Sequence, residues 1–304
     1  MSIYDKSSLV LIPSGTKTGK VYSQKPVSGD GDFTFTRSSA ATRVNADGFI
    51  EKETQNLITN SQNFGDSQWL VGPNVSKTTG QTDPNGGNTA VLFSNPSDTN
   101  GYIYSSVSLQ ANTINTFSIY IKGASAGSVS IRIDGSTTGT RHDVNYTTEW
   151  TRVSCYQIVD QTNCIVVVGG FGTWTAGENI QFAFAQVEQG LVARDYIETT
   201  TTAVEGGITD NVPRLDYTDS SCPALLLEPQ RSNLLVQSEY YATTPYARVN
   251  ASVTHNDLLS PEGVVNATKL VSSGGASRVE TFPTLADTQF TPHLFLQSRV
   301  MLII

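Results

Sequence analysis

Two neighbouring stretches decide the fold of this chain: FSIYIK at residues 117–122 and VSIRID at residues 129–134. In both stretches the odd positions are apolar and the even positions are polar. This period of two is that of a β-strand with one face in a core and the other face in water. The second stretch ends on Asp134-Gly135, a turn pair. Both stretches therefore predict half-buried strands.

Further strand candidates recur between residues 56 and 200, with turn residues between them. The continuous apolar run CIVVV at 164–168 is typical of a central strand that is covered on both faces. No window of twelve residues in this region has a helical period. We therefore expect an all-β fold, namely an antiparallel β-sandwich of the jelly-roll type.

Composition excludes several classes of protein. The 304 residues carry a formal net charge of −8, only 15% charged residues, and 12 Phe, 12 Tyr and 3 Trp. A disordered acidic tail has more charge and fewer aromatics, and a nucleic-acid-binding protein is usually basic. No apolar run is long enough to span a membrane, and the first residues lack the pattern of a secretory signal. An odd number of cysteines, 3, indicates free thiols rather than a disulfide framework.

An internal repeat sets the predicted organisation. NLITNSQ at 56–62 matches NLLVQSE at 233–239, and the same offset relates Pro84 and Gly86 to Pro261 and Gly263. The second copy is shorter than the first, and residues 294–304 fall near the equivalent of 117–122. Either another chain completes the second copy, or the gene product is truncated there.

Four segments follow from the repeat and from shifts in composition. The predicted segments are an N-terminal attachment segment at 1–55, a β-sandwich at 56–200, a linker with lead-in strands at 201–232, and an incomplete second β-sandwich at 233–304.

Several segments resemble structural proteins of phage particles. FTRSSAATRVNADGFI at 35–50 looks like a segment common in such proteins, and PRLDY at 213–217 with LLEPQRSNLL at 226–235 resembles the lead-in to their modules. AQVEQG at 185–190 resembles the closing strand of those modules, and LVLIPSG at 9–15 is similar to the start of such proteins in phages of Bacteroidetes, including crAss-like phages. The sandwich itself resembles carbohydrate-binding modules.

The resemblance implies a virion protein, either a head fibre or a tail fibre. It implies attachment to other capsid or tail proteins through the N-terminal segment, a homotrimer, and adhesion to a host-surface glycan, with no nucleic acid and no membrane insertion. Two departures bear on this interpretation. The first module has ETQN at 53–56 in place of the full lead-in, and the second module is incomplete.

Catalysis finds little support in the sequence. The three histidines, His142, His255 and His293, are too scattered to nominate a triad, and no nucleophile elbow or phosphate-binding loop is present. Three acidic residues, Glu188, Asp134 and Asp143, are candidates, but no pattern distinguishes them from solvated carboxylates. We expect a protein that is not an enzyme and has no catalytic residues.

Sugar binding is better motivated, because aromatic rings stack on sugar rings and charged side chains bond their hydroxyls. Alternation is expected to place polar side chains of 117–122 and 129–134 on one sheet face, with two tyrosines of a further strand nearby. The candidate glycan-binding residues are Tyr102, Tyr104, Tyr120, Lys122, Arg132 and Asp134. The competing interpretation is a solvated sheet face that binds nothing.

The remaining predictions concern tryptophan and metal. Trp69, Trp150 and Trp174 are expected to pack in the core or at hinges rather than in a binding platform. No cofactor is expected, and a structural calcium remains open without nominated ligands. The alternative function is a structural adaptor or decoration protein of the capsid or tail that binds no glycan.

Overall fold

The computed structural model describes residues 2–17, 19–36, 42–52, 54–73, 75–95, 101–135, 139–170, 177–206, 213–226, 233, 235, 237–242 and 245–281. The predictions for Trp174, His293 and residues 294–304 lie outside these ranges. Apart from the short helix α1 (Ile3–Lys6), the regular elements of the described chain are β-strands. No helix in the described part is long and apolar enough to cross a membrane.

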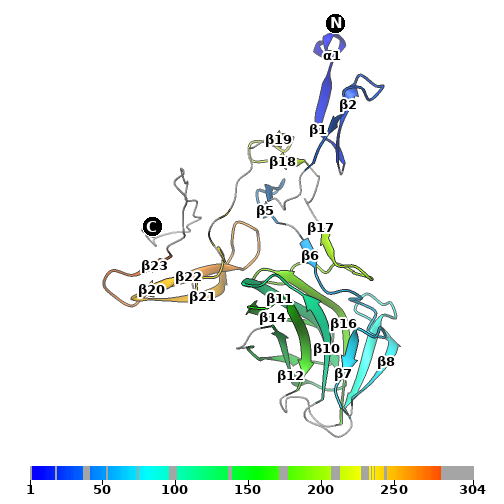
Figure 1. Cartoon of the computed structure of the whole chain (residues 1–304), viewed down its shortest axis with the longest axis vertical. Helices are drawn as coiled ribbons and strands as arrows, with labels where there is room; N and C mark the ends of the chain where they lie inside the picture. Colours follow the sequence, from blue (N-terminus) through cyan, green and yellow to red (C-terminus); the bar gives the residue numbers. More distant parts are fainter. Residues whose placement is uncertain are drawn as a thin grey trace.

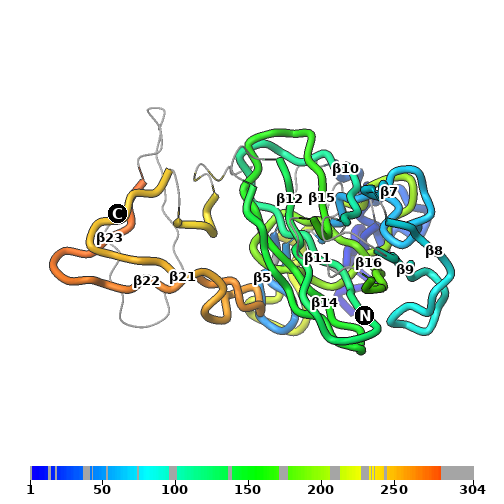
Figure 2. The backbone as a smooth tube through the Cα atoms, turned by 90° about the horizontal axis from the view of Figure 1, so that it is seen from below, coloured from blue at the N-terminus to red at the C-terminus, as the bar shows by residue number. Residues whose placement is uncertain are grey.

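Ten strands form a sandwich of two five-stranded sheets, which Figures 1 and 2 show as two layers. The first, here called the β10 sheet, has the order β13 (His142–Tyr146), β12 (Gly127–Asp134), β15 (Asn163–Gly169), β10 (Tyr102–Ser108) and β7 (Trp69–Val71). The second, the β11 sheet, has the order β14 (Thr151–Val159), β11 (Thr113–Gly123), β16 (Glu178–Gln189), β9 (Ala90–Asn95) and β8 (Ser76–Gln81). Neighbouring strands are antiparallel throughout. The predicted antiparallel β-sandwich is confirmed.

The core lies between the two sheets and is built from the apolar positions of the alternating stretches. Phe117, Ile119 and Ile121 of β11 are fully buried, and Ile131 and Ile133 of β12 are fully buried on the facing sheet. Burying such a side chain contributes about 2 kcal/mol to folding. The period of two therefore explains the sandwich, because each strand places one apolar row between the sheets.

The N-terminal part forms a separate small sheet at one end of the molecule, away from the sandwich (Figure 1). It contains β1 (Val10–Lys17), β2 (Lys20–Lys25) and β3 (Phe33–Thr34). Large apolar side chains remain exposed here, among them Leu9, Ile12, Tyr22 and Phe33. Between this sheet and the sandwich lie the pair β4 (Arg43–Val44) and β5 (Ile50–Glu51), followed by β6 (Thr54–Asn56), which pairs with β17 (Val204–Gly206).

The C-terminal part forms two-stranded pairs, and those after residue 246 lie beside the sandwich (Figure 2). The pairs are β18 (Arg214–Asp216) with β19 (Ala224–Leu226), β20 (Ala247–Val249) with β23 (Arg278–Glu280), and β21 (Ala251–Leu258) with β22 (Ala267–Ser272). The four segment boundaries drawn from the sequence stay predictions.

The loops that the repeat aligns have the same hydrogen bonds. In the first loop, the amide of Asp83 donates to the carbonyl of Gly87 and the amide of Gly86 donates to the carbonyl of Asp83. In the second, the amide of Ser260 donates to Val264 and the amide of Gly263 donates to Ser260. Gly86 and Gly263 also share a positive φ, at 84° and 76°, which favours glycine. The sequence repeat thus corresponds to a repeated local structure.

Candidate functional site

A row of side chains crosses the outer face of the β10 sheet. Tyr104 of β10 lies opposite Leu70 of β7 on one side and opposite Val167 of β15 on the other. Val167 in turn lies opposite Arg132 of β12. Residues directly opposite one another on adjacent strands share a face, and strands lie ~4.8 Å apart, so this row is about 14 Å long. We call Leu70, Tyr102, Tyr104, Arg132, Asp134 and Val167 the tyrosine–arginine face.

Tyr102 occupies the position next to this row on the same strand face. Its ring centroid lies 5.9 Å from that of Tyr104, with 41° between the ring planes. A Cβ atom on Gly72 would come within 2.7 Å of the Tyr102 ring, so the ring packs directly against the backbone of Gly72. A side chain at position 72 would therefore have to displace the Tyr102 ring. The two tyrosines therefore present adjacent, partly exposed aromatic surfaces.

Hydrogen bonds to Asp134 and to Gly169 help to hold Arg132 in place beside the tyrosines. Its Nε donates to Oδ2 of Asp134 at 2.8 Å, and its Nη1 donates to the carbonyl of Gly169 at 3.1 Å. The Arg132 side chain is 12% exposed and that of Asp134 is 37% exposed. A guanidinium fixed in this way is pre-organised, which lowers the entropy cost of binding a polar ligand.

A second ion pair on the neighbouring strand was not predicted as part of the site. Asp143 of β13 lies opposite Ser130, two residues from Arg132 along β12. Arg141 donates to both carboxylate oxygens of Asp143, at 2.7 and 2.6 Å. These hydrogen bonds hold the pKa of Asp143 below its ordinary value. The alternation of residues 142–146 could have predicted this position of Asp143, because it places His142 and Asp143 on opposite faces of the strand.

The prediction that all polar candidates share one sheet is wrong. Tyr120 and Lys122 belong to β11, whereas Arg132 and Asp134 belong to β12, and these strands lie in different sheets. The chain crosses the sandwich at residues 124–126, so identical alternation directs the two polar rows to opposite outer faces. Four of the six candidates are brought together: Tyr102, Tyr104, Arg132 and Asp134.

Tyr120 has a packing role instead. Its ring meets Phe184 edge-on at 5.7 Å, and the guanidinium of Arg152 lies 5.8 Å from its centroid. Together with Trp150 and Tyr196, it covers a small cluster on the outside of the β11 sheet. Trp69, by contrast, lies in the main core, as predicted, and is 2% exposed.

The described histidines and Glu188 also take part in packing. The His142 ring lies 6.1 Å from that of Tyr156, and burial lowers the pKa of His142. His255 stacks on Tyr240 at 4.3 Å. Glu188 accepts hydrogen bonds from the backbone of Arg194 and from the side chain of Gln186. Within the described ranges, no group of three His, Cys, Asp or Glu residues comes together to hold a metal ion.

Comparisons with solved structures find similarity over part of the chain. The chain is similar to the TmCBM61 module in complex with β-1,4-galactotriose, with 18% identity and a TM-score of 0.35 over 45% of this chain and 100% of that one. It is similar to the CBM22-1 xylan-binding domain of Paenibacillus barcinonensis Xyn10C, with 13% identity and a TM-score of 0.38 over 46% and 97%. It is also similar to the enzymatically active domain of bacteriophage CBA120 tailspike protein 4, with 13% identity and a TM-score of 0.33 over 44% and 21%.

These similarities are distant, and the assignment of the fold rests on the two sheets described above. No protein-family model and no curated protein matches the chain.

Proposed function

We propose that the β-sandwich binds a glycan on the tyrosine–arginine face. The observation that carries this proposal is the placement of Tyr104 and Arg132 on either side of Val167, with Tyr102 next to Tyr104. Aromatic surface and a few fixed polar groups are the usual components of a small-ligand site. A sugar offers an apolar ring face to the tyrosines and hydroxyl groups to Arg132 and Asp134.

The protein acts, in this proposal, as a structural part of a phage particle, in a head fibre or a tail fibre. The support is the resemblance of residues 35–50 and 213–217 to segments of phage structural proteins. The N-terminal sheet suits attachment to another virion protein, since it projects from the sandwich and exposes Leu9, Ile12 and Phe33 (Figure 1). A homotrimer is the expected assembly, since closed symmetry is common among oligomers.

The proposed role is binding without cleavage. His142 is half-buried beside the ring of Tyr156, and Glu188 accepts hydrogen bonds from backbone and side chain. The alternative role is an adaptor or decoration protein that binds no glycan. The exposed apolar residues of the N-terminal sheet favour attachment in either case, so only glycan binding separates the two roles.

A glycan array tests this proposal with four proteins: the wild type, Tyr104→Ala, Arg132→Ala and Lys122→Ala. We expect wild-type binding to fall by about tenfold or more in the first two variants, because each removes one component of the face. Lys122→Ala is the matched control, since it removes a positive charge from the opposite sheet and is expected to bind normally. A wild type that binds no glycan favours the adaptor, and equal binding by all four proteins removes the proposed face.

A further inference from the structure

Two arginine–aspartate pairs lie side by side on the outside of the β10 sheet. In each pair the arginine donates to an aspartate two residues further along the chain: Arg132 to Asp134, and Arg141 to Asp143. Asp143 lies opposite Ser130, and continuing this antiparallel register places Arg141 beside Arg132. The second pair therefore lies next to the tyrosine–arginine face, on its β13 side.

These two pairs balance the charge of this part of the surface. Arginines at neighbouring positions of adjacent strands repel each other, and one aspartate for each arginine offsets that repulsion. The five strands of the β10 sheet contain no lysine, no glutamate and no further arginine or aspartate. A ligand that lies on the tyrosines therefore meets two positive and two negative charges, with no excess of either sign.

The carboxylates of both pairs are within reach of a ligand. The side chains of Asp134, Arg141 and Asp143 are between 37% and 48% exposed. Hydrogen bonds from Arg141 hold the pKa of Asp143 below its ordinary value, so this carboxylate is ionised at neutral pH. A ligand thus contacts accessible negative charges as well as guanidinium groups.

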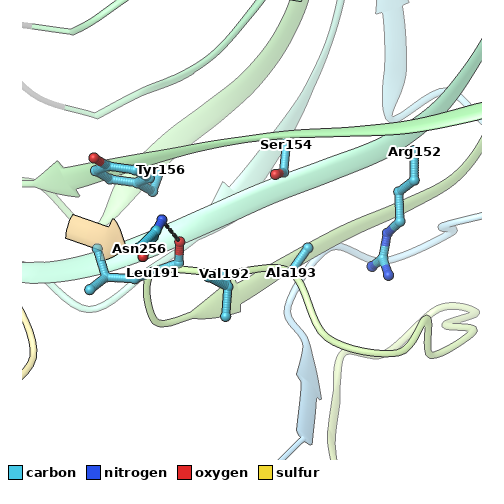
Figure 3. A pocket seen from close by; sticks show the side chains of 7 residues that line it. All are labelled: Arg152, Ser154, Tyr156, Leu191, Val192, Ala193 and Asn256. Carbon is cyan, nitrogen blue, oxygen red and sulfur yellow. Dashed lines mark hydrogen bonds between the residues drawn. The ribbon is translucent and has the colours of Figure 1, made fainter. Parts of the chain in front are cut away.

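An arginine on the opposite sheet is not paired in this way. Arg152 of β14 lines a cavity of about 420 Å³, together with Ser154 and Tyr156 of the same strand (Figure 3). The residue two positions after Arg152 is Ser154 rather than an aspartate. Nη2 of Arg152 donates to Oγ of Ser118 at 3.0 Å. Pairing with aspartate is thus a property of the β10 sheet rather than of every arginine of the sandwich.

We propose that the tyrosine–arginine face selects uncharged glycans over their acidic counterparts. This inference rests on the proposed glycan binding and adds the class of glycan. A hydroxyl group accepts from a guanidinium and donates to a carboxylate, so an uncharged sugar can use both members of a pair. An acidic group would approach Asp134 or Asp143 and compete with that carboxylate for its arginine. Such like-charge contacts are a common means of rejecting a wrong ligand.

Matched glycans on an array test this inference with the full chain. Each neutral oligosaccharide is printed beside the same oligosaccharide with one sialic acid, glucuronic acid or sulfate group, such as lactose beside sialyllactose. We expect the wild type to bind the neutral members at least about tenfold more tightly than the acidic ones. Asp134→Asn and Asp143→Asn should each reduce this ratio by about tenfold, because one opposing carboxylate is removed.

Glu205→Gln is the matched control for the two aspartate variants. The chain has a formal net charge of −8, which disfavours acidic ligands over the whole surface. Glu205 is exposed on β17, outside the sandwich, and its substitution removes the same single charge. The ratio of neutral to acidic binding should stay at the wild-type value in this variant. A change confined to the aspartate variants is therefore local to the face.

The outcomes separate this inference from the proposed function on which it rests. A wild type that binds acidic members as tightly as neutral ones overturns the inference and leaves glycan binding in place. A ratio that neither aspartate substitution changes overturns it in the same way. A wild type that binds no glycan, or glycan binding that survives Tyr104→Ala, removes the proposed function and this inference with it.

Discussion

Glu188 is a carboxylate that folding places almost wholly out of water, at 2% exposure. It lies opposite Thr116 in a polar layer between the β11 sheet and the segment that follows β16. Oε1 of Glu188 accepts a hydrogen bond from the amide of Arg194 at 2.9 Å and another from Nε2 of Gln186 at 2.7 Å. Burial raises the pKa of Glu188 above its ordinary value of 4.5 despite these hydrogen bonds. The hydrogen bond from Arg194 thus holds the chain after β16 in place, while burial disfavours the ionised form of Glu188.

This residue makes stability depend on pH. A raised pKa means that the contribution of Glu188 is fully present below about pH 4.5 and is lost as the pH rises through the folded-state value. Glu188→Gln removes this titration, so the free energy of unfolding of the variant, minus that of the wild type, should increase as pH rises above 4.5. Urea unfolding at several pH values measures the difference, with the exposed Glu149→Gln as control. A difference that stays constant with pH would contradict the prediction.

At the scale of elements, one side chain joins three segments of the first module. Nδ2 of Asn56, at the end of β6, donates to the carbonyls of Ala185 and Ile197 at 3.0 and 2.7 Å. Its Oδ1 accepts from the amides of Ile58 and Val187 at 3.3 and 3.1 Å. Asn56 is fully buried, so these four backbone groups depend on it. This residue closes the sandwich by tying the lead-in strand to β16 and the segment after it.

The repeat supplies a matched pair of variants for this role. Asn233, the counterpart of Asn56, is exposed and accepts the equivalent local hydrogen bond from Leu235 at 3.0 Å. Asn56→Ala should lower the free energy of unfolding by about 3 kcal/mol, because it leaves buried backbone groups unpaired. Asn233→Ala should change it by less than about 0.5 kcal/mol. Urea unfolding followed by tryptophan fluorescence measures both, and equal effects would show that Asn56 has no such role.

The alternation of apolar and polar residues predicts where strands occur better than it predicts which strands pair in one sheet. The stretches 117–122 and 129–134 are strands with the expected inward rows, because a period of two needs only a core on one side. Their assignment to sheets was not predictable, since a three-residue connection at 124–126 serves a hairpin or a crossing between sheets equally well. For the same reason, the sequence could not show that Tyr120 and Arg132 lie on different sheets.

At the scale of the whole molecule, a loop of the C-terminal part docks on the lead-in to the sandwich. The amide of Ile50 donates to the carbonyl of Pro261 at 2.8 Å, and Gly263 lies against the ring of Phe49. Glu262, whose side chain is 9% exposed, forms ion pairs with Lys52 and Arg194. The matching loop of the first module carries Asn85 in place of this glutamate and is exposed. The loop at 260–264 thus has a charged residue, Glu262, that forms ion pairs where it docks, and the matching loop at 83–87 has the uncharged Asn85.

Removing that charge should loosen the junction. Glu262→Ala leaves Lys52 and Arg194 partly buried without this partner, so the docked state becomes less favourable. We expect tryptic cleavage after Lys52 and Arg194 to accelerate by about tenfold, equivalent to about 1.4 kcal/mol. Asn85→Ala, at the matching position, should have no effect. Mass spectrometry of timed digests measures both rates, and an unchanged rate for Glu262→Ala would show that the ion pairs do not hold the junction.

Glycan binding on the β10 sheet is tested most directly by backbone NMR of the full chain, titrated with the oligosaccharide that the wild type binds on the array. Amide shifts should change along β10, β15 and β12, around Tyr104, Val167 and Arg132, and these changes should disappear in Tyr104→Ala. A titration that leaves the amides of these three strands unmoved would contradict the account.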